Sequence, residues 1–269
     1  MTKRKWAGLV LCTVIASVAL LLIVGRKTFF PGQDYTWQTM QQRRVWRVGT
    51  DPSFPPFEQL DATGQPIGYD LDLARAIASA WGMRVEIVAI GFDSLLDALQ
   101  TGQIDSVISA LPYDERLTKN VAYSSPYFDA GIRLAVRKNA TLSRVEQLAT
   151  QRIAVEWGST GDMVGRQLQQ KKSGLHLVQF STPEEAVAAL VNDQTIDALL
   201  VDQVTLRTAQ GRGAPIMAIG PALESNPYVI ALPHTATVLQ AKIEQTLHDL
   251  QANGLLTQLE AKWFDHTQQ

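Results

Sequence analysis

The sequence predicts an α/β protein with two similar lobes, each built on a mostly parallel sheet flanked by helices. Strand-like and helical segments alternate along the first half of the chain, which is typical of a parallel sheet. The second half repeats this plan, because the segment from Ala189 to Ala198 echoes the segment from Ala98 to Ser106 with one residue more. A chain of 269 residues is long enough for two lobes of roughly 100 residues each.

The N-terminal residues resemble a membrane-targeting segment. A basic stretch at residues 3–5 precedes an apolar run at residues 6–24, and about 18 to 20 apolar residues are enough to span a bilayer. No Ala-x-Ala-like cleavage site follows, so an uncleaved anchor over residues 1–28 is favoured over a cleaved signal peptide. The basic residues favour a cytoplasmic N-terminus and place the rest of the chain on the extracytoplasmic face. The only cysteine, Cys12, lies in this run, so the chain has no intrachain disulfide.

The first lobe is expected to begin after a polar linker at residues 29–44. A strand at Val45–Thr50 opens it. A helix at Asp70–Trp81 follows, because Leu73, Ile77 and Trp81 recur at helical spacing and Gly82 stops the helix. The remaining elements expected in this lobe are a strand at 85–88, a helix at 93–100 that ends at Gly102, and a strand at 104–109.

The second lobe is expected to contain a strand at 153–156, a helix at 160–170 and a strand at 175–180. Its next helix has a complete start signal. Thr182 is the candidate N-cap, Pro183 takes the first helical position and Glu185 completes a capping box.

Two segments at 133–138 and 228–232 are expected to be strand-like hinge crossings between the lobes. Apolar helices at 238–250 and 255–264 then return to the first lobe. These boundaries divide the folded part of the chain into a first lobe of residues 45–136 and 229–269 and a second lobe of residues 137–228.

Polar or aromatic residues follow the apolar strands where those strands end. In open α/β sheets, ligands gather beyond the carboxyl ends of the strands, which here are Thr50-Asp51, Ser109, Glu156-Trp157 and Val201-Asp202. The four strand ends therefore predict a cleft for a small ligand.

Two of the candidate side chains suit a solute that carries both a carboxylate and an ammonium group. Arg116 offers a planar cationic fork for the carboxylate, and Asp202 offers an acceptor for the ammonium. The helix start at 158–161 would share the anion. Plainer interpretations stay open: Arg116 as a surface ion-pair residue, Asp51 and Asp202 as loop or capping residues, and Phe54 as a core residue.

The motifs also resemble a known family over nearly the whole stretch from Val45 to Phe264. Gly49-Thr50-Asp51, the segment from Ser109 to Arg116, Gly158-Ser159-Thr160, and Tyr123-Ser124-Ser125-Pro126-Tyr127 together resemble the periplasmic polar amino-acid-binding proteins of ABC transporters, the bacterial extracellular solute-binding proteins of family 3. The resemblance implies a type II-like periplasmic-binding-protein fold with a two-strand hinge. The ligand contacts that it implies are Asp51, Phe54, Phe92, Ser109, Ala110, Leu111, Arg116, Gly158, Ser159, Thr160 and Asp202.

The function implied is capture of a free amino acid between the lobes and delivery to an ABC transporter permease, without cofactor, metal or catalysis, by a monomer tethered through residues 6–24. A net charge of -2 with no basic stripe argues against a nucleic-acid partner.

Glu156 either binds a cationic ligand side chain or forms a salt bridge. A ligand-sensing subunit and a cyclohexadienyl-dehydratase-like enzyme, with Glu156 as its acid or base, are the alternatives. Against the enzyme, the sequence shows no nucleophile with a base partner, because its histidines are scattered along the chain.

Overall fold

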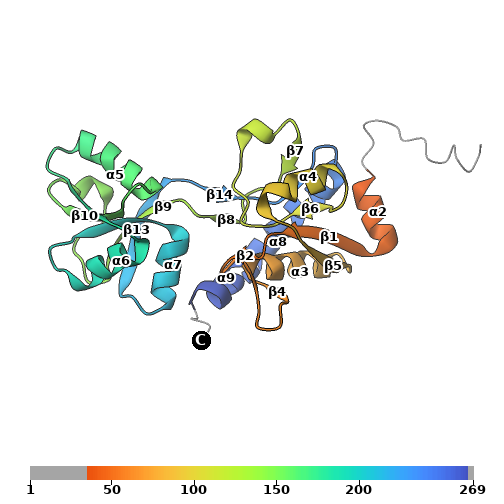
Figure 1. The fold of residues 1–269 in the computed structure, drawn as a ribbon, viewed down its shortest axis with the longest axis horizontal. Helices are drawn as coiled ribbons and strands as arrows, with labels where there is room; N and C mark the ends of the chain where they lie inside the picture. Colours follow the sequence, from red (N-terminus) through yellow and green to blue (C-terminus); the bar gives the residue numbers. More distant parts are fainter. Residues whose placement is uncertain (1–34, 266–269) are drawn as a thin grey trace, which may run out of the picture. The chain divides into compact units, whose positions relative to one another are not determined.

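The structure is a computed structural model that describes residues 35–265. Two five-stranded sheets form its framework, and helices pack against the faces of each sheet (Figure 1). The expected α/β fold with two sheet-based lobes is confirmed. Within residues 35–265 we find no helix with the length and apolar composition needed to cross a bilayer. The anchor predicted at residues 6–24 lies outside the described residues.

The first sheet has the strand order β5-β1-β6-β15-β7. Strand β1 lies between two parallel neighbours, and its residues Val48 and Gly49 pair with Ser106 and Val107 of β6. Strand β15 is antiparallel to both β6 and β7. The strands are β1 (Val45–Thr50), β5 (Arg84–Ala89), β6 (Ser106–Val107), β7 (Val121–Tyr123) and β15 (Ala231–Pro233), and a small separate sheet holds β2 (Ser53–Phe54), β3 (Glu58–Leu60) and β4 (Pro66–Ile67).

The second sheet has the order β11-β10-β12-β9-β13. Strands β11, β10 and β12 are parallel, whereas β9 runs antiparallel to β12 and β13. The strands are β9 (Ile132–Arg137), β10 (Arg152–Glu156), β11 (His176–Phe180), β12 (Ala198–Asp202) and β13 (Ile216–Glu224).

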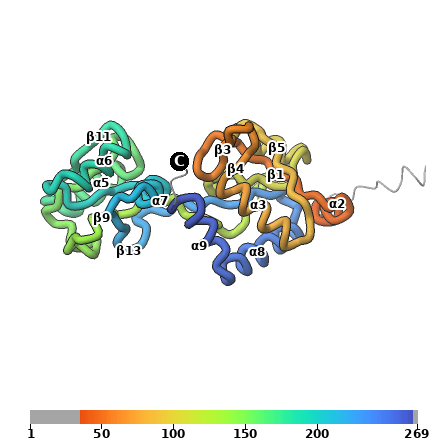
Figure 2. The backbone as a smooth tube through the Cα atoms, turned by 90° about the horizontal axis from the view of Figure 1, so that it is seen from below, coloured from red at the N-terminus to blue at the C-terminus, as the bar shows by residue number. Residues whose placement is uncertain are grey.

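Helices from both ends of the chain cover the first sheet. Helix α3 packs against α8 and α9, and the three lie side by side in Figure 2. The apolar stripe of α8, which includes Leu239, Ile243 and Leu247, is buried with Leu73 and Ile77 of α3 in one core, as expected. The helices are α3 (Tyr69–Ala80), α4 (Leu95–Gln100), α8 (Thr237–Ala252), α9 (Leu255–Glu260) and a π-helical end η4 (Ala261–Asp265), with short 3-10 turns η1 (Phe92–Ser94) and η2 (Glu115–Leu117).

The expected linker is partly folded. Residues Thr36–Arg43 form helix α2, Met40 is fully buried in the first core, and Trp37 packs edge-on against Trp81 with ring centroids 5.1 Å apart. The Gln-rich composition of this segment concealed the helix, because only two of its side chains provide the apolar contact.

The second sheet carries α5 (Thr160–Lys171), α6 (Pro183–Asn192) and α7 (Gln203–Gly211), and the short turn η3 (Val145–Gln147) lies before β10. The start signal predicted for α6 is present. Thr182 Oγ1 accepts a hydrogen bond from the Glu185 N–H at 3.2 Å, and the Glu185 carboxylate accepts from the Ser181 N–H at 3.0 Å. The capping box therefore closes one residue further back than its simplest form.

The crossing between the sheets lies earlier than expected. Strands β8 (Phe128–Asp129) and β14 (Pro227–Tyr228) form a separate two-stranded sheet, and Figure 1 shows them running between the two larger sheets. Asp129 ties the two segments together, because its Oδ1 accepts from the Asn226 N–H at 2.8 Å. The predicted crossing at 133–138 was wrong: β9 is an apolar strand buried inside the second sheet, between β12 and β13.

Candidate functional site

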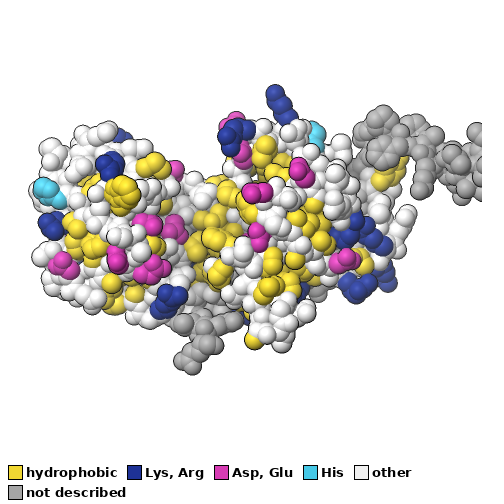
Figure 3. All heavy atoms as spheres, in the orientation of Figure 1, with side chains coloured by type: hydrophobic (Ala, Val, Ile, Leu, Met, Phe, Trp, Pro, Cys, Tyr) yellow, Lys and Arg dark blue, Asp and Glu magenta, His cyan; other side chains and the backbone are white. Residues whose placement is uncertain are grey.

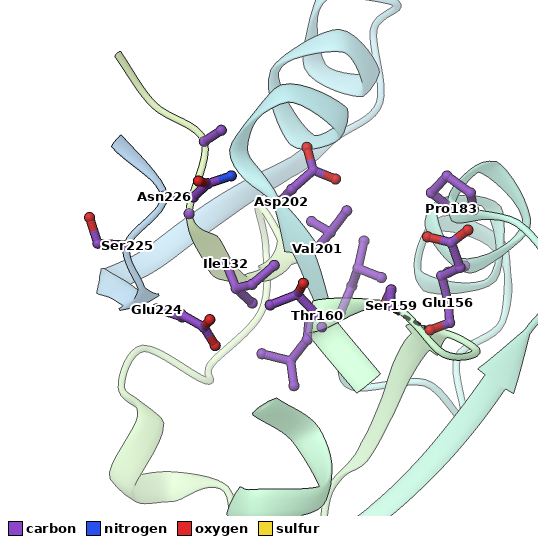
Figure 4. A pocket seen from close by; sticks show the side chains of 16 residues that line it. Ile132, Glu156, Ser159, Thr160, Pro183, Val201, Asp202, Glu224, Ser225 and Asn226 are labelled. Atoms are coloured by element: carbon purple, nitrogen blue, oxygen red, sulfur yellow. Dashed lines mark hydrogen bonds between the residues drawn. The ribbon is translucent and has the colours of Figure 1, made fainter. Parts of the chain in front are cut away.

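A cavity of about 390 Å³ lies at the carboxyl ends of β10 and β12 (Figure 4). Figure 4 shows Glu156, Ser159 and Thr160 on one side and Glu224, Ser225 and Asn226 on the other, with Asp202 at the start of α7. The expected contacts Ser159, Thr160 and Asp202 therefore line one cavity. Strand-end geometry brings them together, as parallel β10 and β12 end at the same edge.

The start of α5 presents backbone N–H groups to this cavity. Ser159 is the N-cap: its Oγ accepts from the Asp162 N–H at 3.1 Å and donates to the Glu156 carbonyl at 2.8 Å. Among the described residues, the N–H groups of Thr160 and Gly161 have no hydrogen-bond partner, and both residues line the cavity. Unpartnered N–H groups at a helix start favour an anion.

Gly158 and Gly161 make this approach possible. Gly158 has φ 76°, a left-handed conformation that favours glycine, and it turns the chain into α5. A Cβ on Gly161 would lie 2.7 Å from the Leu200 carbonyl oxygen of β12. Glycine therefore lets the first turn of α5 pack directly on the strand that ends at Asp202. The Gly158 N–H itself donates to Asp162 at 3.1 Å.

The cavity is acidic. Its lining includes Glu156, Asp202 and Glu224, and among the described residues it includes no lysine, arginine or histidine. Figure 3 shows acidic side chains gathered on the second lobe over α6 and α7 as well. Asp202 is also the N-cap of α7, where its two oxygens accept from the Thr205 N–H at 2.8 Å and the Thr205 hydroxyl at 2.7 Å. A carboxylate has about four acceptor positions, so the cap leaves Asp202 able to accept from a ligand.

The first-lobe residues form a separate hydrogen-bonded group at the end of β1. The Asp51 N–H donates to Ser109 Oγ at 2.9 Å, and Asp51 Oδ2 accepts from the Phe92 N–H at 2.9 Å. Ser109 and Ala110 are buried, whereas the Phe92 side chain is exposed. The structure therefore brings Asp51 and Ser109 together as expected from the strand ends, and it places Phe92 beside them.

Arg116 lies beside this group in a groove of about 620 Å³ that Phe92 and Leu111 also line. Its guanidinium is paired with Asp114, and its side chain is 88% exposed. The hydrogen bonds from Arg116 lower the pKa of the Asp114 carboxyl. The cavity at α5 includes neither Arg116 nor any other of the expected first-lobe contacts.

Phe54 stacks on Phe57, with ring centroids 5.9 Å apart and planes inclined by 13°. Phe57 is fully buried and Phe54 is 44% exposed. The interpretation of Phe54 as a core residue was therefore wrong: Phe57 is the core residue, and Phe54 offers an aromatic face at the surface.

Two buried acids beneath the first-lobe group escaped the sequence analysis. Glu58 begins β3 and Asp70 is the second residue of α3, and both are almost fully inaccessible to solvent. Burial, together with the neighbouring Asp70 charge, raises the pKa of Glu58 to about 11, and burial raises the pKa of Asp70 to about 6. The sequence signal that could have pointed to this pair is Glu58, an acid that directly follows Pro55-Pro56-Phe57. Across residues 35–265 no cluster of acids, histidines or cysteines is arranged to hold a metal ion.

Two lobes that are joined by a two-stranded crossing and carry polar groups at their strand ends define a solute-binding protein. The chain matches the bacterial extracellular solute-binding proteins, family 3, over residues 46–266. It therefore belongs to this family, as the motifs indicated.

Individual relatives are more distant. The histidine-binding periplasmic protein of Salmonella typhimurium is 26% identical over 228 residues, covering 81% of this chain and 87% of that protein. An ancestral cationic amino acid solute binding protein is similar in structure, with a TM-score of 0.64 and 28% identity over 85% of this chain and 99% of that one. An ancestral cyclohexadienyl dehydratase shares the fold, with a TM-score of 0.73 and 22% identity over 84% of this chain and 95% of that one.

Proposed function

We propose that this chain captures a cationic L-amino acid on the extracytoplasmic side of the membrane and presents it to an ABC transporter permease. The observation that carries the proposal is the cavity at α5, where two unpartnered N–H groups and three carboxylates line the same space. An amino acid with a basic side chain carries one anionic and two cationic groups, which this lining complements. The names of two relatives, for histidine and for cationic amino acids, agree with it.

Each ligand group has a proposed partner. The Thr160 and Gly161 N–H groups bind the ligand carboxylate, which the dipole of α5 also favours. Asp202 accepts from the ammonium group. Glu156 accepts from the cationic side chain, since Glu156 lines the cavity and takes part in none of the ion pairs of the described residues. The alternative salt-bridge role of Glu156 thereby loses support.

The first lobe completes the site when the lobes close on the ligand. Arg116, oriented by Asp114, donates to the ligand carboxylate. Asp51 and Ser109 supply polar contacts, and Phe54 and Phe92 supply aromatic walls. Leu111 and Ala110 form the base of this half of the site. Closure is favoured only by contacts made in the closed state, so a ligand held by both lobes shifts the population toward it.

The anchor at residues 6–24 would tether the receptor to the cytoplasmic membrane, and we propose a monomer that acts without a cofactor and without catalysis. A sensing subunit would use the same ligand site. The dehydratase alternative has the shared fold in its favour, but likeness at 22% identity extends to the fold alone.

The test is titration calorimetry of the full chain with the proteinogenic L-amino acids and with prephenate-like dicarboxylates. We expect binding of L-arginine, L-lysine or L-histidine and weaker binding of L-glutamine. At a concentration of about 100 times the dissociation constant, the ligand should add about 2.7 kcal/mol to the free energy of unfolding. Binding of none of the amino acids, or turnover of a dicarboxylate, would contradict the proposal.

A further inference from the structure

Glu58 and Asp70 are two buried acids on adjacent segments, because the Asp70 N–H donates to the carbonyl of Phe57, the residue before Glu58, at 3.0 Å. Their exposed fractions are 1% and 0%. With both groups ionised, Glu58 Oε2 and Asp70 Oδ1 have no hydrogen-bond donor. A carboxylate without a donor is costly to bury. One proton held between the two groups supplies the missing donor and removes one of the two negative charges.

The surroundings place this proton on Glu58. Asp70 lies in the first turn of α3, where the helix dipole favours its anion, and its Oδ2 accepts from the Ala110 N–H at 2.6 Å and from the Tyr127 hydroxyl at 2.9 Å. Glu58 Oε1 accepts from Ser109 Oγ at 3.0 Å. The pKa of about 11 for Glu58 and of about 6 for Asp70, both raised mainly by burial, agree with this order of protonation.

The other charged and titratable groups that face the pair do not neutralise it. Asp51 adds a negative charge near Glu58, and the phenols of Tyr69, Tyr127 and Tyr228 lie around the two acids, Tyr69 from α3 itself and the other two from two further segments of the chain. Among residues 35–265, neither acid takes part in an ion pair with a basic side chain. A shared proton is therefore the way in which this cluster reduces its charge.

The pair contacts the proposed ligand-binding loop directly. Ser109 Oγ donates to Glu58 and accepts from the Asp51 N–H, so three residues form one chain of hydrogen bonds. The Ala110 N–H donates to Asp70 from a left-handed backbone with φ 42°, which residues other than glycine seldom adopt. The acids thus hold the backbone at the end of the first-lobe strand in a conformation that it would not adopt by itself.

We propose that Glu58 and Asp70 are positioning residues that share one proton and fix Asp51, Ser109 and Ala110 in the conformation that binds the ligand. The positioning role deepens the proposed function and rests on it, because it concerns ligand binding. The shared proton itself is a property of the fold and is testable without a ligand.

The first experiment counts protons. Calorimetric unfolding of the ligand-free full chain at about pH 8, in two buffers that differ in ionisation enthalpy, measures the protons released on unfolding. We expect the wild type to release about one proton more than E58Q, because the unfolded chain ionises Glu58 and the glutamine amide has no proton to lose. Equal proton release would overturn the shared proton.

The second experiment measures L-arginine binding. E58M removes both the donor to Asp70 and the acceptor for Ser109, so we expect a loss of affinity of about tenfold or more. E58Q, whose amide reproduces both hydrogen bonds, should restore the affinity to within about threefold of the wild type. The exposed Glu86 of β5 provides the matched control E86Q, for which no change is expected.

The outcomes separate the two proposals. A wild type that binds no amino acid contradicts the proposed function, whereas the proton count still tests the pair. A wild type that binds L-arginine, together with an E58M variant that binds it equally well, contradicts the positioning role. If E58M does not fold, E58Q still tests the shared proton: it should release about one proton fewer than the wild type on unfolding at about pH 8, and equal release would contradict the proposal.

Discussion

Arg116 and Asp114 form a bidentate ion pair, in which Nη2 lies 2.7 Å from Asp114 Oδ2 and Nε lies 2.9 Å from Oδ1. The two residues are close in sequence, Arg116 is exposed and Asp114 is only half-buried, so the pair contributes little to stability. It does keep the guanidinium fork oriented at the groove that Phe92 also lines. An oriented fork loses less freedom when it binds a ligand carboxylate.

The Arg116→Ala variant should retain its stability and lose ligand affinity. We expect a loss of about a hundredfold or more, since a charge-assisted bidentate contact is removed. Titration calorimetry with L-arginine measures it. The matched control is Arg75→Ala, which removes another exposed arginine that pairs with an aspartate, Asp72, on helix α3. Equal affinity of the wild type and Arg116→Ala would exclude Arg116 as the carboxylate partner.

The Glu156→Gln variant should change the selectivity of the site. Removal of the charge should weaken L-arginine binding by about tenfold and leave L-glutamine binding within about threefold, because only the cationic side chain needs the carboxylate. Competition between the two ligands in one titration gives the ratio directly. A uniform loss for both ligands would show that Glu156 supports the cavity instead of contacting the side chain.

The Asp202→Asn variant separates the two roles of Asp202. Asparagine caps a helix about as well as aspartate, so the free energy of unfolding should change by less than about 0.5 kcal/mol. Ligand affinity should fall by about tenfold or more, because the ammonium group loses a charged acceptor. Urea unfolding and calorimetry measure the two quantities. A variant that loses stability and keeps affinity would assign Asp202 to the cap alone.

Asp72 provides a pH-dependent anchor for the C-terminal segment. Its Oδ2 accepts from Lys262 Nζ at 2.6 Å and from the Trp263 ring N–H at 2.9 Å. Burial alone would raise the pKa of Asp72, but the hydrogen bonds from Lys262 and Trp263 outweigh it and hold the pKa below its usual value of 3.8. Asp72 therefore stabilises the fold above that pH, and the stabilisation is lost as the pH falls through its lower folded-state pKa.

We expect Asp72→Asn to cost about 1 kcal/mol at neutral pH. The difference from the wild type should shrink at about pH 3, where the unfolded aspartate is mostly protonated and gains less from folding. Urea unfolding at both pH values measures this difference. Asp249→Asn on the exposed face of α8 is the control, and a difference that does not depend on pH would contradict an ionic role for Asp72.

Helix starts and stops that depend on neighbouring residues were predicted correctly from the sequence. The start of α6 is set by Thr182, Pro183 and Glu185, which act within one turn. The stop at Gly102 follows from its left-handed φ of 71°. Such features depend on neighbours in sequence, so the sequence contains all that is needed to find them.

The features that the sequence analysis missed, helix α2 and the position of strand β9, depend on contacts between distant parts of the chain. Helix α2 exists because Met40 and Trp37 contact a core whose other members lie far along the chain. Strand β9 resembles a crossing in its sequence, yet its pairing with β12 and β13 places it inside the second sheet. The position of a crossing depends on which strands pair, and pairing is not a property of one segment.

By itself the sequence determined the α/β plan, the family and the strand ends at which the candidate contacts lie, because periodicity, caps and motifs are local in the chain. Only the tertiary structure decided that Glu224 joins Thr160 and Asp202 in one cavity and that Arg116 pairs with Asp114. It alone brought Glu58 and Asp70 together beneath Ser109 and Ala110, because the protonation of buried acids depends on partners that folding supplies from distant segments.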